Sequence, residues 1–300
     1  MLAHIPDGFL SAPVLLGTAL TSAGALAVAA RRSRAALAER QVPLLGAITA
    51  FVFAAQMFNF PIAAGSSAHL LGGVLVAALA GPSVAMLVIF SVVLVQALLF
   101  QDGGIAALGA NTLNLAVLGA GGGWLAYRWL LALLGARFRV AAVTVAAFLS
   151  ALLTGLGVAL ELGFSQVVPA RTALLVVGGA HLLVGIGEAA LTGAILALVW
   201  RARPELAAAQ PVPGPAVRAW TLGLTATSLL LALAAGSLAS RRPDVLEAAA
   251  FRFGLRERAL HAAPFAGYET VLGWPWLVAL AGVAAVFLCG WLLLRALARR

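Results

Sequence analysis

Apolar residues run through the whole chain in long segments that are separated by short polar stretches or by proline and glycine. Several segments contain 18 or more residues with few charges, the length that an apolar helix needs to cross a bilayer core of roughly 30 Å. The pattern predicts an all-α integral membrane protein with nine transmembrane helices. The third range is short for a crossing and predicts a tilted, broken or partly re-entrant segment. The expected ranges are 8–30, 44–64, 68–81, 83–101, 109–134, 140–163, 172–200, 217–239 and 272–296.

The composition narrows the class of protein. The 300-residue chain is 63% hydrophobic and 10% charged, which excludes a soluble enzyme, a disulfide-built secreted domain and a disordered protein. Its one cysteine, Cys289, allows neither an internal disulfide nor a multi-cysteine metal site. All 19 basic residues are arginines. Because the phosphate-binding loop of an ATPase needs a lysine, the chain is not expected to carry such an ATPase of its own.

The arginines also predict how the chain is oriented, because cytoplasmic connections are enriched in basic residues. With the N-terminus outside, thirteen of the 19 arginines fall on the cytoplasmic side, and five of the other six lie in one outer loop, 240–271. An N-out, C-in topology is therefore expected. The proline-rich segment at 204–217 is typical of a linker. It predicts a seven-helix unit at 1–203 and a two-helix unit at 218–300.

Polar residues inside apolar segments are informative in a membrane protein, because a charge at the bilayer centre costs roughly 3 kcal/mol unless it is paired. His4 lies close to the α-amino group, and such nitrogens, with the backbone amides between them, suit Ni(II) or Cu(II). The spacing alone nevertheless favours an exposed, frayed chain end. Gln56 and Asn59 precede His69, which is expected at the outer end of the third helix, on the same side as His4. A histidine held by interhelical hydrogen bonds is the alternative.

A third polar region runs from Gln96 through Asp102 to Asn114. It contains an Asp-Gly-Gly turn expected on the outer side, where glycine supplies positive φ. Asn111 and Asn114 are three residues apart on one helical face, and at that depth both amides need partners.

The fourth region comprises Glu161 in the sixth predicted helix and His181 and Glu188 in the seventh. His181 and Glu188 are seven residues apart and therefore share a helical face. A proton relay, a pair of metal ligands and a buried structural pair all remain possible interpretations of these residues.

Five segments carry a family resemblance when they are taken together. They are HIPDGFL at 4–10, AAQMFNFPI at 54–62, GSSAHLLGG at 65–73, QALLFQDGGIAALGANTLN at 96–114 and HLLVGIGEAALT at 181–192. The first unit resembles the CbiM/NikM family, the substrate-binding membrane components of energy-coupling-factor (ECF) transporters for cobalt and nickel. The second unit resembles the small N-type component of the same systems. Its hallmark PDGLE here has valine for glycine, in Pro243-Asp244-Val245-Leu246-Glu247.

The resemblance implies a multi-pass protein of a bacterial or archaeal cell membrane that captures Ni²⁺ or Co²⁺ from outside. It implies no tightly bound cofactor and no catalytic residue. ATP hydrolysis is left to separate cytoplasmic ATPases, joined through a transmembrane coupling (T) protein. The fusion of the two units slightly favours nickel over cobalt as the transported metal.

The resemblance also implies a ligand set: the N-terminal amine, the amide and imidazole of a first histidine, and the imidazole of a second. By motif match the histidines are His4 and His69. Here Leu2 and Ala3 separate His4 from Met1, so the amine belongs to Met1 if the chain is unprocessed. If Met1 and Leu2 are removed, the amine ligand is instead the α-amino group of Ala3, and we favour this version. Loss of Met1 alone would let Leu2-Ala3-His4 supply four planar nitrogens without His69. The expected supporting network is Asp7, Gln56, Asn59, Gln96, Asp102, Asn111, Asn114, His181 and Glu188.

The sequence also permits two functions other than metal capture. An intramembrane enzyme would use Glu161, His181 and Glu188. An ECF component for an organic vitamin would need an aromatic-lined cavity, which an aromatic content of 8% does not favour. The 240–271 loop is expected to meet the first unit near the metal entrance. Asp244 and Glu247 are suited to attract a cation, but five arginines make the loop net basic, so a conformational role in loading is favoured.

Overall fold

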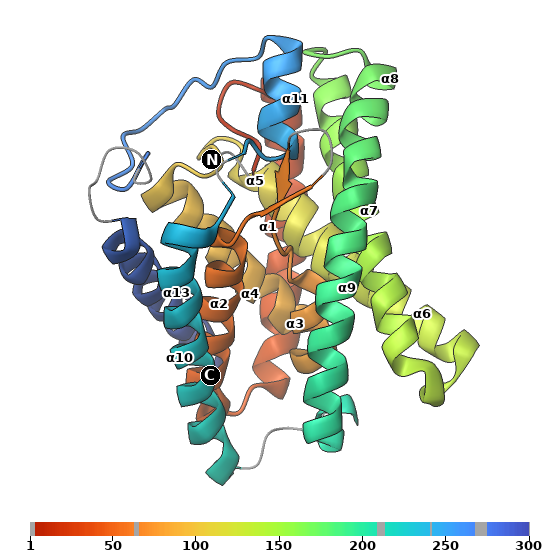
Figure 1. The fold of residues 1–300 in the computed structure, drawn as a ribbon, viewed down its shortest axis with the longest axis vertical. Coiled ribbons are helices and arrows are strands. Elements are labelled where there is room, and N and C mark those ends of the chain that lie inside the picture. The colour runs from red at the N-terminus through yellow and green to blue at the C-terminus, as the bar shows by residue number, and fades with distance from the viewer. Residues whose placement is uncertain (1–3, 63–65, 209–213, 241, 268–274, 300) are drawn as a thin grey trace.

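The protein is a bundle of helices that run along its long axis (Figure 1). The computed structural model describes residues 4–62, 66–208, 214–240, 242–267 and 275–299. Three of its long helices are built from consecutive pieces that include a stretch of wider π-helical turns. The helices are α1 (Ala12–Ala36), α2 (Val42–Met57), α3 (Gly73–Ala80), α4 (Pro82–Val95) with η3 (Gln96–Phe100), α5 (Leu108–Thr112) with η4 (Leu113–Gly122) and α6 (Gly123–Leu134), α7 (Arg139–Phe164), α8 (Ala170–Ala173) with η6 (Leu174–Gly178) and α9 (Gly179–Ala202), α10 (Gly214–Leu238), α11 (Val245–Phe253) and α13 (Pro275–Ala298).

Each of the nine predicted ranges contains a helix. In the described part of the chain, seven helices are long and apolar enough to cross a membrane by length and composition. Helix α2 has 16 residues and α3 has 8, so both are shorter than a full crossing. The short third helix agrees with the sequence, and the chain is a multi-pass membrane protein. The orientation in the membrane stays a prediction.

The connection between α2 and α3 differs from the prediction. The ranges 44–64 and 68–81 were expected to be helical, but strand β1 (Phe60–Pro61) pairs antiparallel with β2 (Ser67–Ala68). Helix α3 begins only after Gly72, whose φ of +75° lies in the left-handed region. The expectation that His69 lies at the end of a helix is therefore wrong, because His69 lies in the loop before α3. A short apolar run does not distinguish a helix from an extended segment.

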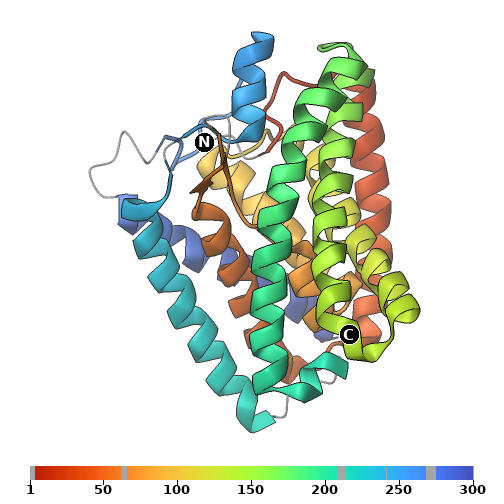
Figure 2. The ribbon, with the colours of Figure 1, turned by 45° about the vertical axis from the view of Figure 1, so that its right-hand side comes forward.

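The C-terminal helices pack closely on the N-terminal part of the chain. Helices α10 and α13 both contact α2, and α13 also contacts α4 (Figure 2). A Cβ atom added to Gly290 of α13 would lie 2.5 Å from the Oγ1 atom of Thr49 in α2. This approach requires glycine, as is common between membrane helices. The division into units at 204–217 stays a prediction. A helical turn occupies Pro204–Ala208, α10 already begins at Gly214, and residues 209–213 lie outside the described residues.

The loop 240–271, which is predicted to lie outside, contains a helix, α11, that was not expected from the sequence. Asp244 caps its N-terminus by accepting a hydrogen bond from the Glu247 N–H, and Gly254 follows its last turn with a φ of +67°. An acidic cap with a glutamate three residues later is a known helix-start signal, and glycine a known stop. Helix α11 lies at the same end of the bundle as residues 4–10 (Figure 1). The last residues of α13 lie toward the opposite end (Figure 2).

Candidate metal site

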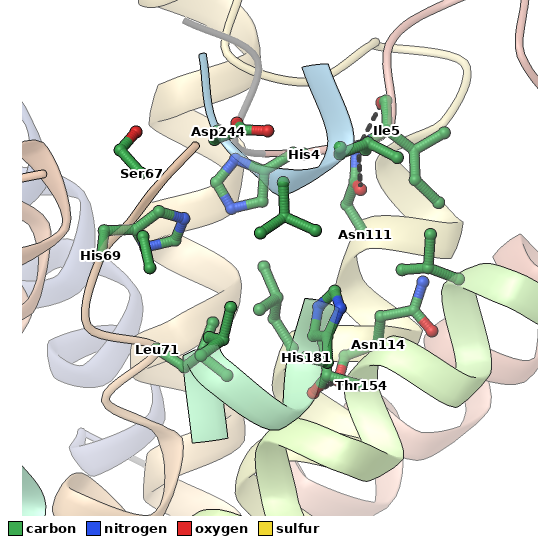
Figure 3. A pocket seen from close by; sticks show the side chains of 16 residues that line it. His4, Ile5, Ser67, His69, Leu71, Asn111, Asn114, Thr154, His181 and Asp244 are labelled. Atoms are coloured by element: carbon green, nitrogen blue, oxygen red, sulfur yellow. Dashed lines mark hydrogen bonds between the residues drawn. The ribbon is translucent and has the colours of Figure 1, made fainter. Parts of the chain in front are cut away.

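A small cavity lies where residues 4–10 meet α11 and the loop before α3 (Figure 3). Its volume is about 50 Å³, which is enough for one or two water molecules or for an ion of similar size. Sites for organic ligands of drug size enclose roughly 300–1,000 Å³. The lining residues are His4, Ile5, Ser67, Ala68, His69, Leu71, Asn111, Asn114, Leu115, Thr154, Val158, His181, Val184, Asp244, Val245 and Leu246.

His4 is buried at the upper end of this cavity. The residue is 2% exposed, so the interpretation of His4 as an exposed residue is wrong. Its Nδ1 atom lies 3.1 Å from Oδ1 of Asp102, while its Nε2 atom is buried and has no hydrogen-bond partner in the described part of the chain. Burial lowers the pKa of His4, but the adjacent Asp102 carboxylate outweighs it, and the net direction is upward. The same contact overcomes the effect of burial on Asp102 and lowers its pKa.

His69 faces His4 across the cavity. The ring centroids are 6.2 Å apart and the ring planes are inclined by 45°. The Nδ1 atom of His69 lies 3.0 Å from the carbonyl oxygen of Leu70. Because a carbonyl only accepts, Nδ1 carries the proton, which leaves the Nε2 lone pair available. Burial and the nearby positive charge of His4 lower the pKa of His69, and a neutral imidazole is the form that binds metals.

The backbone that carries His4 is held in place by α5 and the preceding turn. Asn111 accepts a hydrogen bond from Ile5 N–H at 2.8 Å and donates one to the Ile5 carbonyl at 3.0 Å. The Asp7 carboxylate accepts from the N–H groups of Ile105 and Ala106. The predicted turn is present: Gly103 has a φ of +94°, and a Cβ atom there would lie 2.8 Å from that of His4.

The loop that carries His69 is held by buried polar side chains from distant helices. Glu188 of α9 accepts hydrogen bonds from Leu71 N–H at 2.7 Å and Gly72 N–H at 3.0 Å. Gln56 of α2 donates to the Leu71 carbonyl and accepts from Gln96. These contacts lock the loop around its backbone, as second-shell groups do for metal ligands.

Other predicted residues lie lower in the cavity or away from it. His181 places Nδ1 2.8 Å from the Val177 carbonyl, so it and Glu188 share a helical face but have different partners. Asn111 and Asn114 also have different partners: the Asn114 amide donates a hydrogen bond to the Glu161 carboxylate at 2.7 Å. The backbone carbonyl of Asn59 accepts a hydrogen bond from Ser240 N–H, so this residue connects the segment after α2 to the segment after α10.

Three polar lining residues, Ser67, Thr154 and Asp244, are not among the predicted site residues. Ser67 gave no signal beyond its place in the GSSAHLLGG motif, Thr154 none beyond a hydroxyl in an apolar helix, and Asp244 was predicted only to suit the attraction of a cation. Thr154 donates to the Asn114 carbonyl, which keeps its hydroxyl satisfied at the lower end of the cavity.

Side chains alone do not complete a metal site here. Among the described residues, no group of three or more His, Cys, Asp or Glu side chains is placed to hold a metal ion. A metal ion bound by the two imidazoles would therefore take its further ligands from the main chain or from water. The candidate amine ligands, Met1 and Ala3, lie outside the described residues.

Comparison with known proteins identifies the family. The CbiM family, described as the cobalt uptake substrate-specific transmembrane region, matches residues 4–206. The chain belongs to the CbiM family. Both histidines, the loop before α3 and the Asp-Gly-Gly turn fall inside the matched range, whereas Asp244, Val245 and Leu246 of the cavity lining lie outside it.

Relatives of this CbiM-family protein carry related names. One from Archaeoglobus fulgidus, "Putative fused nickel transport protein NikMN", is 34% identical over 261 residues, which cover 86% of this chain and 85% of that protein. Such a match extends beyond residue 206 and agrees with a CbiM unit fused to an N-type component. The fused nickel transport protein NikMN of Rhodobacter capsulatus is 32% identical and covers 70% of this chain and 65% of its own length. A crystal structure of a truncated transition metal transporter matches with a TM-score of 0.61 at 31% identity, over 66% of this chain and 98% of that chain.

Proposed function

We propose that this protein captures Ni²⁺ or Co²⁺ at its outer face for uptake by an ECF-type transporter. The observation that carries the proposal is the pair of buried imidazoles, His4 and His69, which face each other across a cavity of about 50 Å³. Imidazole suits late first-row metals. The cavity is far smaller than an organic ligand requires, which argues against a vitamin.

The enzyme alternative has less support. It needs Glu161, His181 and Glu188 to act together, but each of these side chains has its own structural partner. Glu188 in particular is committed to two backbone N–H groups. A transport protein that only binds the metal does not require these three side chains to meet at one point.

The ligand set proposed for the metal is the amine of Ala3, the amide and imidazole of His4, and the imidazole of His69. A histidine that binds one metal through its amide and its ring uses Nδ1, the atom that contacts Asp102 in the structure. Loading therefore replaces the contact between Nδ1 and Asp102 by a bond to the metal. Four nitrogens in a plane favour Ni²⁺ over Co²⁺, and competition between the two ions during uptake tests this preference.

Uptake is expected to depend on partners. Cells that express this chain with a T protein and ATPases from the same genome should accumulate radioactive nickel or cobalt. Cells that lack the ATPases should not, because the chain has no lysine for a phosphate-binding loop. Accumulation against a gradient without those partners would contradict the ECF assignment, and a genome that encodes none of them would contradict it as well.

The N-terminus is expected to tolerate no extension. A histidine-free Gly-Ser-Glu tag before the mature terminus should abolish tight Ni²⁺ binding, because it removes the amine and adds charge to a buried site. The same tag after Arg300 is the control and should leave binding unchanged. Mass spectrometry of the mature chain should find Ala3 as its first residue. An intact Met1 in a protein that binds and transports the metal would contradict the processing step.

A further inference from the structure

The second unit reaches the cavity through the segment before α11. Ser67 of β2 donates its N–H to the Pro243 carbonyl at 2.8 Å, and its hydroxyl donates to the Arg242 carbonyl at 2.8 Å. Ser67 and Asp244 form a parallel backbone bridge. The backbone of the second unit is therefore hydrogen-bonded to a strand that ends one residue before His69.

The carboxylate of Asp244 is held at the cavity by two independent features. Its Oδ1 atom accepts a hydrogen bond from Glu247 N–H at 2.7 Å, which caps α11. Leu246, Ala249 and Ala250 of α11 pack in one apolar cluster with Ile5 and Phe9. Helix α11 is thus fixed relative to the segment that carries His4, and Asp244 lies beside His4 (Figure 3).

The other carboxylate oxygen has no hydrogen-bond partner among the residues that the structure describes. Oδ2 of Asp244 is buried and makes no hydrogen bond, and the residue is only 4% exposed. Burial raises the pKa of Asp244 to about 7. An unpaired buried carboxylate oxygen is costly, and native proteins seldom retain one without a use. A cation or its bound water would satisfy it.

We propose that Asp244 is an oxygen ligand that the second unit supplies to the entering metal ion, in exchange for one of its waters, before His4 and His69 bind the ion. The inference rests on the proposed function and adds a residue of the second unit to it. A hydrated Ni²⁺ or Co²⁺ ion has water oxygens as its ligands. A carboxylate that replaces one water therefore exchanges one oxygen ligand for another. No preformed set of three side-chain ligands exists among the described residues, which fits a transient role rather than a place in the final nitrogen set.

The charge of the loop does not provide this capture. Loop residues 240–271 are net basic, and Arg242 is exposed, so long-range attraction of a cation is weak. The carboxylate acts inside the cavity, where it neutralises part of the charge of the entering ion. The role of the second unit is therefore both structural, through Ser67, and chemical, through Asp244.

The test separates ligation from helix capping. The variants Asp244→Asn and Asp244→Ser keep a side chain that caps a helix well but remove the carboxylate. Purified full-length protein is mixed with Ni²⁺ alone, and the loading rate and dissociation constant are measured by stopped flow and by equilibrium dialysis. We expect both variants to load roughly 10–100-fold more slowly. Glu247→Gln removes one charge from the same helix turn without lining the cavity, and it should load like the wild type.

Each outcome has a distinct meaning. Wild-type loading by both Asp244 variants would overturn the inference and leave the proposed function intact. Equal slowing by Glu247→Gln would mean that loop charge, not the cavity carboxylate, matters, and would also overturn it. A wild-type chain with a confirmed mature N-terminus that binds neither Ni²⁺ nor Co²⁺ would contradict the proposed function and the inference together.

Discussion

Replacement of His4 or His69 by alanine in the full chain should weaken Ni²⁺ binding by at least about 100-fold. Loss of a second-shell partner alone costs roughly 10–100-fold in metal affinity, and these imidazoles are proposed to touch the metal directly. Both are buried and line one cavity, so a water-exposed side chain of the described residues does not reach their place. Equilibrium dialysis of the purified protein with radioactive nickel measures the effect.

The chain offers two histidines as controls for this experiment. His261 is partly buried, does not line the cavity, and places its Nε2 atom 3.3 Å from the Leu98 carbonyl, so His261→Ala should bind like the wild type. His181 lines the lower part of the cavity and contacts Val177, so His181→Ala should cost less than tenfold. Tight nickel binding by His69→Ala would contradict the shared site and would favour a terminus of Leu2-Ala3-His4.

Replacement of Glu188 by alanine should both destabilise the protein and weaken metal binding. Glu188 is 2% exposed and accepts from two backbone N–H groups. Each buried group left unsatisfied costs about 1–3 kcal/mol, so the free energy of unfolding should fall by about 2–5 kcal/mol. Because Leu71 is two residues after His69, the loosened loop should also lower nickel affinity. Thermal denaturation followed by tryptophan fluorescence, with dialysis in parallel, measures both.

Two variants refine the interpretation of Glu188. Glu188→Gln keeps one carbonyl oxygen as an acceptor and should fall between the wild type and alanine. Thr192→Val removes only a weaker contact of 3.3 Å to Glu188 and should cost less than about 1 kcal/mol. A Glu188→Ala protein with unchanged stability and changed binding would instead indicate direct contact of Glu188 with the metal.

Local sequence determined most of the helices and the family. Long apolar runs specify membrane helices because the bilayer requires every backbone group to be satisfied within the segment. The same segments carry the family's motifs, so His4 and His69 were predictable as a pair of candidate ligands. Helix α11 was predictable in principle, because its cap Asp244, Glu247 and the terminal Gly254 are local signals.

Tertiary structure alone decided how the polar residues are used. The partners of Asn111, Glu188 and Asp102 lie about 100 residues away along the chain, and no local pattern encodes such pairs. His181 and Glu188 share a helical face as predicted, yet they serve different segments, because what packs opposite each residue depends on the assembled bundle. The position of Asp244 beside His4 depends on the pairing of Ser67 with the second unit. The sequence determines which groups must find a partner, because an unpaired polar group in an apolar medium is costly, and the packing of distant helices determines which partner each one finds.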